Sequence, residues 1–282
     1  MDAYSKYLSN ALNKYKIHVS SYHGNAGDEL IIKATFKIIK NLDNNFINAN
    51  CNEADIILIP GGNFSMWQIF YNKIYDYITN YNAKLIIGPS TFHGNFTDWR
   101  NLLINNTSRF EALFPRDKIS HDNLLELNLY EVYIKQVCDS AFTLRSSNLV
   151  KSLKNISESK YNLVVLRNDH ESLNLINTND IKFRNKITRK FYRSLNKRII
   201  KKRIKKLNIK DPLVKDVVHL NFSEFCDYIA KSKCIYTDRL HVTILGLMLN
   251  KKVYILKTNY DKISNALEGN ISENEEKLLY FE

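Results

Sequence analysis

The sequence predicts an α/β protein made of two Rossmann-like halves that face each other across a cleft. Short apolar runs recur along its 282 residues, and the segments between them carry apolar residues at three- and four-residue spacing. Short runs bounded by glycine, proline or polar turns are typical of buried parallel strands, and the intervening periodicity is typical of crossover helices. Their alternation predicts parallel sheets covered by helices, and the length suits two domains.

The predicted elements follow one another in a regular order. The strands are the apolar runs at 17–21, 56–60, 85–88, 132–138, 163–166, 217–220, 234–237 and 253–256. The helices are the periodic segments at 30–39, 66–81, 124–130, 222–231 and 240–249. Serine residues interrupt the pattern between 145 and 160. We therefore predict a first domain over 1–150 and a second over 151–282.

The composition excludes several classes of protein. Hydrophobic residues make up 44% and charged residues 25%, and there are only 8 Gly and 4 Pro, which argues against collagen-like or low-complexity chains. The 4 cysteines are far apart without a Cys-x-x-Cys pair, so we expect neither a zinc knuckle nor a redox motif. The chain shows no signal peptide and no apolar run of about 18 residues. We expect a cytoplasmic protein.

The positive charge is concentrated in one segment. The chain carries a formal charge of +12, and residues 182–210 hold fourteen basic residues and no acid, so subtracting these fourteen charges leaves −2 for the rest. Apolar residues recur within this segment at intervals of three to five, which predicts a helix with one apolar stripe and basic sides. Because the rest is near neutral and shows no known nucleic-acid-binding module, we expect no nucleic-acid partner.

Two glycine-containing loops follow the first two predicted strands. In open α/β sheets ligands bind outside the carboxyl ends of the strands, so these loops are candidate binding elements. In the first loop, Asn25, Gly27 and Asp28 precede a helix, and Asp28 is a candidate N-cap whose helix leaves free amides for an anion. In the second loop, Gly62 and Asn63 permit close approach of a substrate. An ordinary tight turn is the alternative for both loops.

Four further loops place charged side chains or imidazoles after apolar segments. His93, Arg116 and Arg167 each stand alone, and a structural role is the alternative for each, such as an ion pair of Arg116 with its neighbour in sequence. Arg239 and His241 occur together where a strand passes into an apolar helix. Arginine offers a fixed fork of donors to an anion and histidine a proton near neutral pH, so here we favour a catalytic role.

Taken in order, five motifs resemble those of the polysaccharide pyruvyl transferase family. The resemblance runs from about residue 20 to residue 268, and its most specific element is Asp-Arg-Leu-His followed by an apolar helix. The motifs that carry it are Gly24-Asn25-Ala26-Gly27-Asp28-Glu29, Gly61-Gly62-Asn63, Arg116-Asp117-Lys118-Ile119-Ser120, Asp139-Ser140-Ala141-Phe142 and Thr237-Asp238-Arg239-Leu240-His241. This chain departs from the family in its short Gly61-Gly62-Asn63 turn and in Val242, which affects the expected shape of the acceptor pocket.

The resemblance implies a fold similar to GT-B glycosyltransferases and transfer of a pyruvyl group from phosphoenolpyruvate to a sugar of a cell-surface polysaccharide, forming a ketal. It implies no metal and no cofactor. By the same resemblance, Arg116 and Arg239 look like the binders of the anionic donor, and His241 looks like the general acid and base. The further residues matched to the family's site, or kept as candidates from the loops above, are Gly27, Asp28, Lys262, His93, Asn25, Gly62, Asn63 and Arg167.

Two alternatives concern the donor and the basic segment. A GT-B-like glycosyltransferase would use the same loops to hold a nucleotide sugar, and a fold alone does not decide between donors. In the simplest interpretation, the apolar stripe of the predicted helix at 182–210 packs on the second domain. In the functional interpretation, the segment contacts the anionic inner face of the membrane, where it would hold the site near a lipid-linked acceptor.

Overall fold

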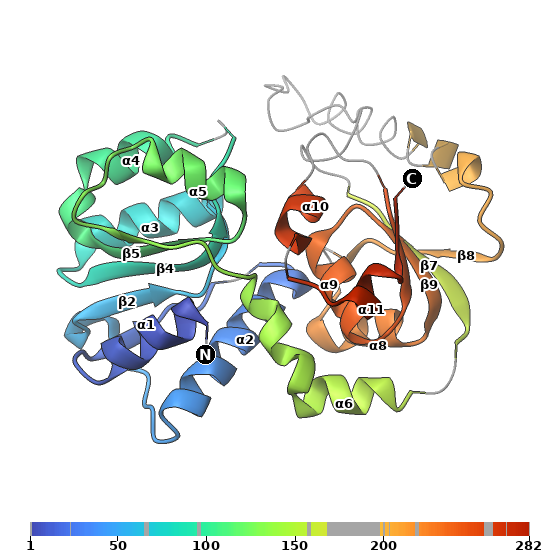
Figure 1. The fold of residues 1–282 in the computed structure, drawn as a ribbon, viewed down its shortest axis with the longest axis horizontal. Helices are drawn as coiled ribbons and strands as arrows, with labels where there is room; N and C mark the ends of the chain where they lie inside the picture. The colour runs from blue at the N-terminus through green and yellow to red at the C-terminus, as the bar shows by residue number, and fades with distance from the viewer. Residues whose placement is uncertain are drawn as a thin grey trace, which may run out of the picture. The chain divides into compact units, whose positions relative to one another are not determined.

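The structure is a computed structural model that divides into two compact units. The first unit comprises Met1–Gly24 and Asp28–Arg145, and the second comprises Asn25–Gly27 and Ser146–Glu282. The structure describes residues 2–22, 24–64, 68–94, 97–156, 159–167, 198–199, 201–202, 204–217, 220–256, 262–268 and 270–281. Each unit has its own parallel sheet with helices packed on it (Figure 1). The predicted α/β fold class is confirmed.

The sheet of the first unit is parallel throughout its described strands. Its order is β1-β2-β4-β5-β6, and β3 pairs with the end of β4. The strands are β1 (Ile17–Val19), β2 (Ile56–Ile59), β3 (Gly62–Asn63), β4 (Lys84–Thr91), β5 (Phe110–Pro115) and β6 (Tyr133–Ile134). Helix α1 (Ala3–Leu12) precedes β1, and the segments between the strands contain α2 (Ala26–Leu42), α3 (Gln68–Asn80), α4 (Trp99–Asn105) and α5 (Lys118–Leu125).

Helices cover both faces of this sheet because its strands are apolar on both sides. Successive side chains of a strand point to opposite faces. Ile57 and Ile59 of β2 therefore join one core with α3, α4 and α5, whereas Ile56 and Leu58 join the other with α1 and α2 (Figure 1). The carboxyl ends of the strands are left to the loops, where the candidate residues lie.

The second unit repeats the arrangement with the strand order β11-β10-β9-β7-β8, again parallel. Its strands are β7 (Tyr161–Val165), β8 (Pro212–Val214), β9 (Ser232–Thr237), β10 (Lys252–Ile255) and β11 (Leu279–Phe281). Its helices are α6 (Asn148–Lys154), α8 (Phe222–Ala230), α9 (Leu240–Met248), α10 (Lys262–Leu267) and α11 (Glu273–Glu276). Helix α9 is buried along its length except at His241, and a Cβ on Gly246 would lie 2.7 Å from Cδ1 of Ile235. The absence of a side chain there lets α9 pack closely on β9.

Several predicted elements differ from the observed ones. The helix expected at 124–130 was largely wrong, because α5 ends at Leu125. It begins at Lys118, where Asp117 caps it by accepting a hydrogen bond from the Ser120 amide. The apolar run at 132–138 forms only the short edge strand β6, whereas the sheet contains β5, which was not predicted. In the second unit, the described ends of 217–220 are not strand residues, and β8 precedes them.

The serine-rich stretch near the change of unit also has a local structural role. Ser147 caps α6 by accepting a hydrogen bond from the Val150 amide at 3.2 Å.

The N-terminal cap of α2 differs from the prediction. Helix α2 begins at Ala26, and Oδ1 of Asn25 accepts a hydrogen bond from the Gly27 amide at 2.8 Å. Asp28 therefore lies inside the first turn of α2, and its prediction as the N-cap was wrong.

Candidate active site

Arg116 is the best-anchored candidate residue of the first unit. It directly follows β5, and its Nη1 contacts Oδ2 of Asp139 at 2.6 Å while its Nε donates to Oγ1 of Thr91 at 3.0 Å. The side chains of Arg116 and Asp139 are only 2% and 0% exposed. A buried arginine and carboxylate at this distance form a charge-assisted pair that fixes both side chains.

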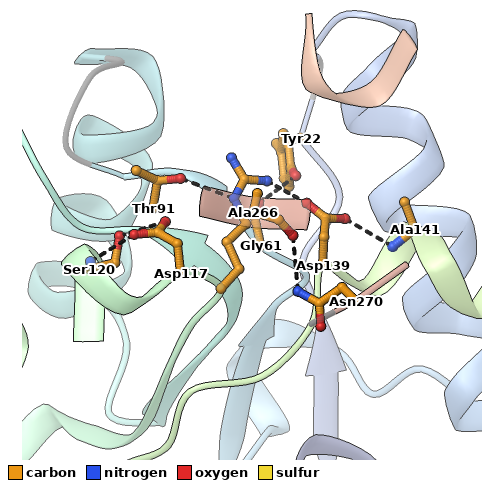
Figure 2. Close-up of polar contacts among 10 residues, drawn as sticks. Tyr22, Gly61, Thr91, Asp117, Ser120, Asp139, Ala141, Ala266 and Asn270 are labelled. Carbon is orange, nitrogen blue, oxygen red and sulfur yellow. Dashed lines mark hydrogen bonds and ion pairs between the residues drawn. The ribbon is translucent and has the colours of Figure 1, made fainter. Parts of the chain in front are cut away.

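The surrounding residues hold this pair in place. The second carboxylate oxygen of Asp139 accepts a hydrogen bond from the Ala141 amide at 3.0 Å, at the start of the 3₁₀ helix Ser140–Ser146 (Figure 2). The Asp117 carboxylate has other partners, because it caps α5 and also accepts a hydrogen bond from the Ser120 hydroxyl at 2.9 Å. The alternative in which Arg116 pairs with its neighbour in sequence is therefore not what the structure shows.

A tyrosine that the sequence analysis did not select orders the glycine loop after β2. The hydroxyl of Tyr22 donates to the carbonyl oxygen of Gly61 at 2.6 Å (Figure 2). Burial, with a further contribution from the Asp28 carboxylate, raises the pKa of Tyr22 well above its ordinary value, so the hydroxyl stays protonated at neutral pH. Its position directly after the first strand was the signal that could have identified it.

The glycine loop itself requires glycine. Gly61 has φ of +137° and Gly62 has φ of +142°, and a Cβ on Gly61 would lie 2.4 Å from the carbonyl oxygen of Pro89. The next residue, Asn63, is buried in β3 and pairs in register with Thr91. His93 lies two residues beyond Thr91 and is half-buried. The first unit thus gathers Tyr22, Asn63, His93 and Arg116 at the carboxyl ends of its strands, where the fold predicts a ligand site.

In the second unit, the turn from β9 into α9 is fixed by backbone contacts. The hydroxyl of Thr237 donates to the carbonyl of Val165 at 2.8 Å, and Oδ1 of Asp238 accepts from the Arg167 amide at 2.7 Å. Both contacts join the end of β9 to the end of β7. Asp238 therefore has a structural role, and the same contact places the predicted candidate Arg167, itself 8% exposed, beside this turn.

Arg239 is a candidate arginine of the second unit and precedes α9. Its side chain is nearly buried, at 7% exposed, and Nη2 lies 3.9 Å from Oδ1 of Asp216, a carboxylate that is 44% exposed. An ion pair this long with a solvated partner is weak. Arg239 thus places a second, nearly buried guanidinium at the residue that precedes α9.

His241 lies against the start of α2. Residues Asn25–Gly27 group with the second unit, and a Cβ on Gly27 would lie 2.8 Å from Nδ1 and 2.9 Å from Cβ of His241. Gly27 is buried and His241 is half-buried. The glycine predicted from the loop pattern is therefore required because the imidazole occupies the space that a side chain would need.

The remaining candidates are placed only in part. Lys262 is the first residue of α10, but its side chain lies outside the described part of the chain. Beyond the end of this helix, the side-chain amide of Asn270 donates a hydrogen bond to the carbonyl oxygen of Ala266 at 2.9 Å (Figure 2). Among the residues that the structure describes, no group of three or more His, Cys, Asp and Glu side chains is placed to hold a metal ion.

The arrangement in each unit is suited to a different task. The first unit offers a guanidinium whose direction is fixed by Asp139 and Thr91. The second offers an imidazole and a second guanidinium on the opening residues of one buried helix. Such groups can bind an anion and move a proton.

Comparison with known families decides what kind of protein carries these residues. A family model described as polysaccharide pyruvyl transferase matches residues 25–260. The chain belongs to the polysaccharide pyruvyl transferase family. The match contains Gly27, Arg116, Arg239 and His241, so the transferase class and the predicted family are confirmed.

One of the similar solved structures shows a related fold over the whole chain. The protein KP1_0663 from Klebsiella pneumoniae subsp. pneumoniae NTUH-K2044, described as uncharacterized, has 22% sequence identity and a TM-score of 0.64, with 100% of this chain and 99% of that chain covered. The wall teichoic acid polymerase TagF gives 11% identity and a TM-score of 0.41, over 90% of this chain and 72% of that one. The UDP-GlcNAc 2-epimerase from Methanocaldococcus jannaschii has 15% sequence identity and a TM-score of 0.35, with 92% of this chain and 74% of that chain covered. Among curated proteins, no sequence matches significantly.

The basic segment is described only at 198–199, 201–202 and 204–210. Within it, Ile204 and Leu207 pack against an apolar cluster that includes Leu166 and Leu256 of the second unit. The described lysines 201, 202, 205 and 206 are exposed. No helix in the described part of the chain is both long and apolar enough to cross a membrane.

Proposed function

We propose that this family member transfers the pyruvyl group of phosphoenolpyruvate to a sugar of a cell-surface polysaccharide or of its lipid-linked precursor, forming a pyruvate ketal. Membership of the family supports the reaction class. The single observation that carries the proposal is the pair Arg239 and His241 at the opening of α9, with Gly27 packed on the imidazole. A cation and a proton carrier two residues apart suit an anionic donor whose reaction needs proton transfer.

The chemistry needs two sugar hydroxyls and one proton carrier. The oxygen of the first hydroxyl bonds to C2 of phosphoenolpyruvate while C3 takes a proton and becomes a methyl group. The second hydroxyl then replaces the phosphate at C2, and phosphate leaves with the electrons of the broken bond. The two hydroxyl protons end on the methyl group and on the released phosphate. In this scheme His241 removes and delivers the protons, and the arginines offset the charge on the leaving phosphate.

The donor would be held by groups from several loops. Arg239 and Arg116 bind its carboxylate and phosphate, and Lys262, Gly27 and Asp28 complete the donor site. The other candidate site residues, each on a loop of its own unit, are His93, Asn25, Gly62, Asn63 and Arg167. The proposal includes no metal and no cofactor, with phosphoenolpyruvate as the co-substrate.

Where the reaction takes place is part of the same proposal. The exposed lysines beside the packed Ile204 and Leu207 support a segment with one buried side and one basic side. We place the enzyme in the cytoplasm, with this segment at the anionic inner face of the membrane and the acceptor linked to lipid. No nucleic-acid partner is included.

Phosphate release tests the donor. The full chain is incubated with phosphoenolpyruvate and a panel of nucleotide sugars and lipid-linked oligosaccharides, and phosphate is measured with and without each acceptor. We expect release that depends on acceptor, and we expect His241→Gln to abolish it while the thermal unfolding temperature stays near that of the wild type. Release of a nucleotide from a nucleotide sugar, with phosphoenolpyruvate unused, would instead identify a glycosyltransferase.

A further inference from the structure

The network around Arg116 extends the proposed function to two residues without an assigned role. Of the three guanidinium nitrogens, Nε is bonded to Thr91 and Nη1 to Asp139. Nη2 has no hydrogen-bond partner within the described residues. We propose that Asp139 and Thr91 are positioning residues that hold the guanidinium by these two nitrogens and present Nη2 to the anionic donor. This inference rests on the proposed binding of phosphoenolpyruvate by Arg116.

Asp139 can position the Arg116 guanidinium because it is buried and held from two sides. Its carboxylate is 0% exposed and accepts hydrogen bonds from both the guanidinium and the Ala141 amide. A carboxylate in this environment is anchored to the backbone of the 3₁₀ helix Ser140–Ser146, so it cannot swing with the arginine. It therefore ties the direction of the guanidinium to that helix.

Thr91 fixes the other side of the guanidinium. It is the last residue of β4 and is 0% exposed, and its neighbour Ser90 accepts a hydrogen bond from the Arg116 amide through its carbonyl oxygen at 3.0 Å. The backbone and side chain of Arg116 are thus both tied to the end of β4. A guanidinium held by its Nε and Nη1 loses little further rotamer freedom when a ligand binds, which favours binding.

The same pair limits how Arg116 attracts a donor. Asp139 lies 2.6 Å from Nη1, so the pair is close to neutral and its field at a distance is small. Arg116 therefore contributes a directed hydrogen bond more than a long-range attraction. We accordingly expect the affinity contributed by Arg116 to depend only weakly on salt.

Equilibrium binding of phosphoenolpyruvate to the full chain, measured by titration calorimetry without acceptor, tests the positioning role. Thr91→Val keeps the shape of the side chain and removes the acceptor for Nε, so we expect binding to weaken about fivefold, with recovery in Thr91→Ser. Asp139→Asn should weaken it by about tenfold or more. Ser90→Ala is the matched control, because this neighbouring hydroxyl is equally buried and has no hydrogen-bond partner in the described part.

The Arg116→Ala variant distinguishes a failure of the positioning role of Thr91 and Asp139 from a failure of the donor-binding role of Arg116. If it weakens binding while Thr91→Val and Asp139→Asn bind as the wild type does, the positioning role is wrong and the donor role stands. If the wild type does not bind phosphoenolpyruvate, or if Arg116→Ala binds equally well, both fail. Should Asp139→Asn not fold, the comparison of Thr91→Val with Thr91→Ser decides, because a merely structural threonine would change the unfolding temperature and leave the dissociation constant unchanged.

Discussion

Replacing Gly27 with alanine tests whether the start of α2 positions His241. The new Cβ would lie 2.8 Å from Nδ1 and 2.9 Å from Cβ of His241, and 2.9 Å from Oδ1 of Asn25. Relaxed carbon contacts are about 3.5–4.0 Å, so the groups must separate by roughly 1 Å. Rotation of the imidazole alone does not relieve the overlap, because the Cβ of His241 is close to its own backbone.

The structure sets the size of the expected effect. A misplacement of about 1 Å of a catalytic group lowers a rate by about a hundredfold. We expect Gly27→Ala to reduce kcat by about that factor. The donor contact proposed for Gly27 would add a rise in the KM for phosphoenolpyruvate, and a rise in KM with an unchanged kcat would mean that Gly27 acts on the donor and does not position His241.

The assay is phosphate release at varied phosphoenolpyruvate, with Gly246→Ala as the matched control. A Cβ at Gly246 would lie 2.7 Å from Cδ1 of Ile235 and 3.0 Å from Cγ2 of Val253, so this variant strains α9 on its core side and leaves the space beside His241 unchanged. Overpacking of this kind lowers stability by about 1–3 kcal/mol. We expect Gly246→Ala to lose stability and keep its kcat. Equal kcat in Gly27→Ala and the wild type would refute the positioning of His241 by α2.

Three further predictions concern the glycine loop, Arg239 and the basic segment. Gly61→Ala should lose at least about 2 kcal/mol of stability in chemical denaturation, because its Cβ would lie 2.4 Å from the Pro89 carbonyl at a φ of +137°; unchanged stability would contradict the strained loop. Arg239→Ala should weaken phosphoenolpyruvate binding by roughly ten- to a hundredfold in calorimetry, and Arg239→Lys should recover it only in part; full recovery would exclude a directed contact. Co-sedimentation with vesicles should require anionic lipid, weaken with salt and disappear when the basic residues are changed to glutamate; a wild type that ignores anionic vesicles at low salt would exclude membrane contact. The residues to change are Lys201, Lys202, Arg203, Lys205 and Lys206.

Local patterns predicted much of the fold because parallel strands are buried on both sides. The runs at 56–60 and 234–237 lie in β2 and β9, and the apolar segment at 240–249 contains α9. Prediction failed where one side chain decides the outcome. Asp117 starts α5 earlier than the apolar periodicity suggests, and Asn25 rather than Asp28 caps α2. Such competition between neighbouring capping residues depends on backbone geometry that a sequence does not display.

The family could be predicted from the sequence, whereas the contacts of the candidate residues could not. The ordered motifs identified the family, and the family model confirms it. The partner of Arg116 is Asp139, which is 23 positions away in sequence, whereas local reasoning pointed to its neighbour Asp117. Likewise, the need for glycine at position 27 follows from His241, which belongs to the other end of the chain. Contacts between distant segments arise only from the folded arrangement of the strands.

Mass spectrometry of an acceptor after reaction decides whether the protein forms a pyruvate ketal. The full chain is mixed with phosphoenolpyruvate and the panel of lipid-linked and nucleotide-linked sugars, with His241→Gln as the control. We expect one acceptor to gain the mass of one pyruvic acid less one water and its proton spectrum to gain a methyl signal, and we expect neither gain with the control. A vinyl signal at the same mass would identify an enolpyruvyl ether in place of the ketal. An acceptor that gains the mass of a sugar from a nucleotide sugar, and no mass from phosphoenolpyruvate, would contradict the proposed pyruvyl transfer.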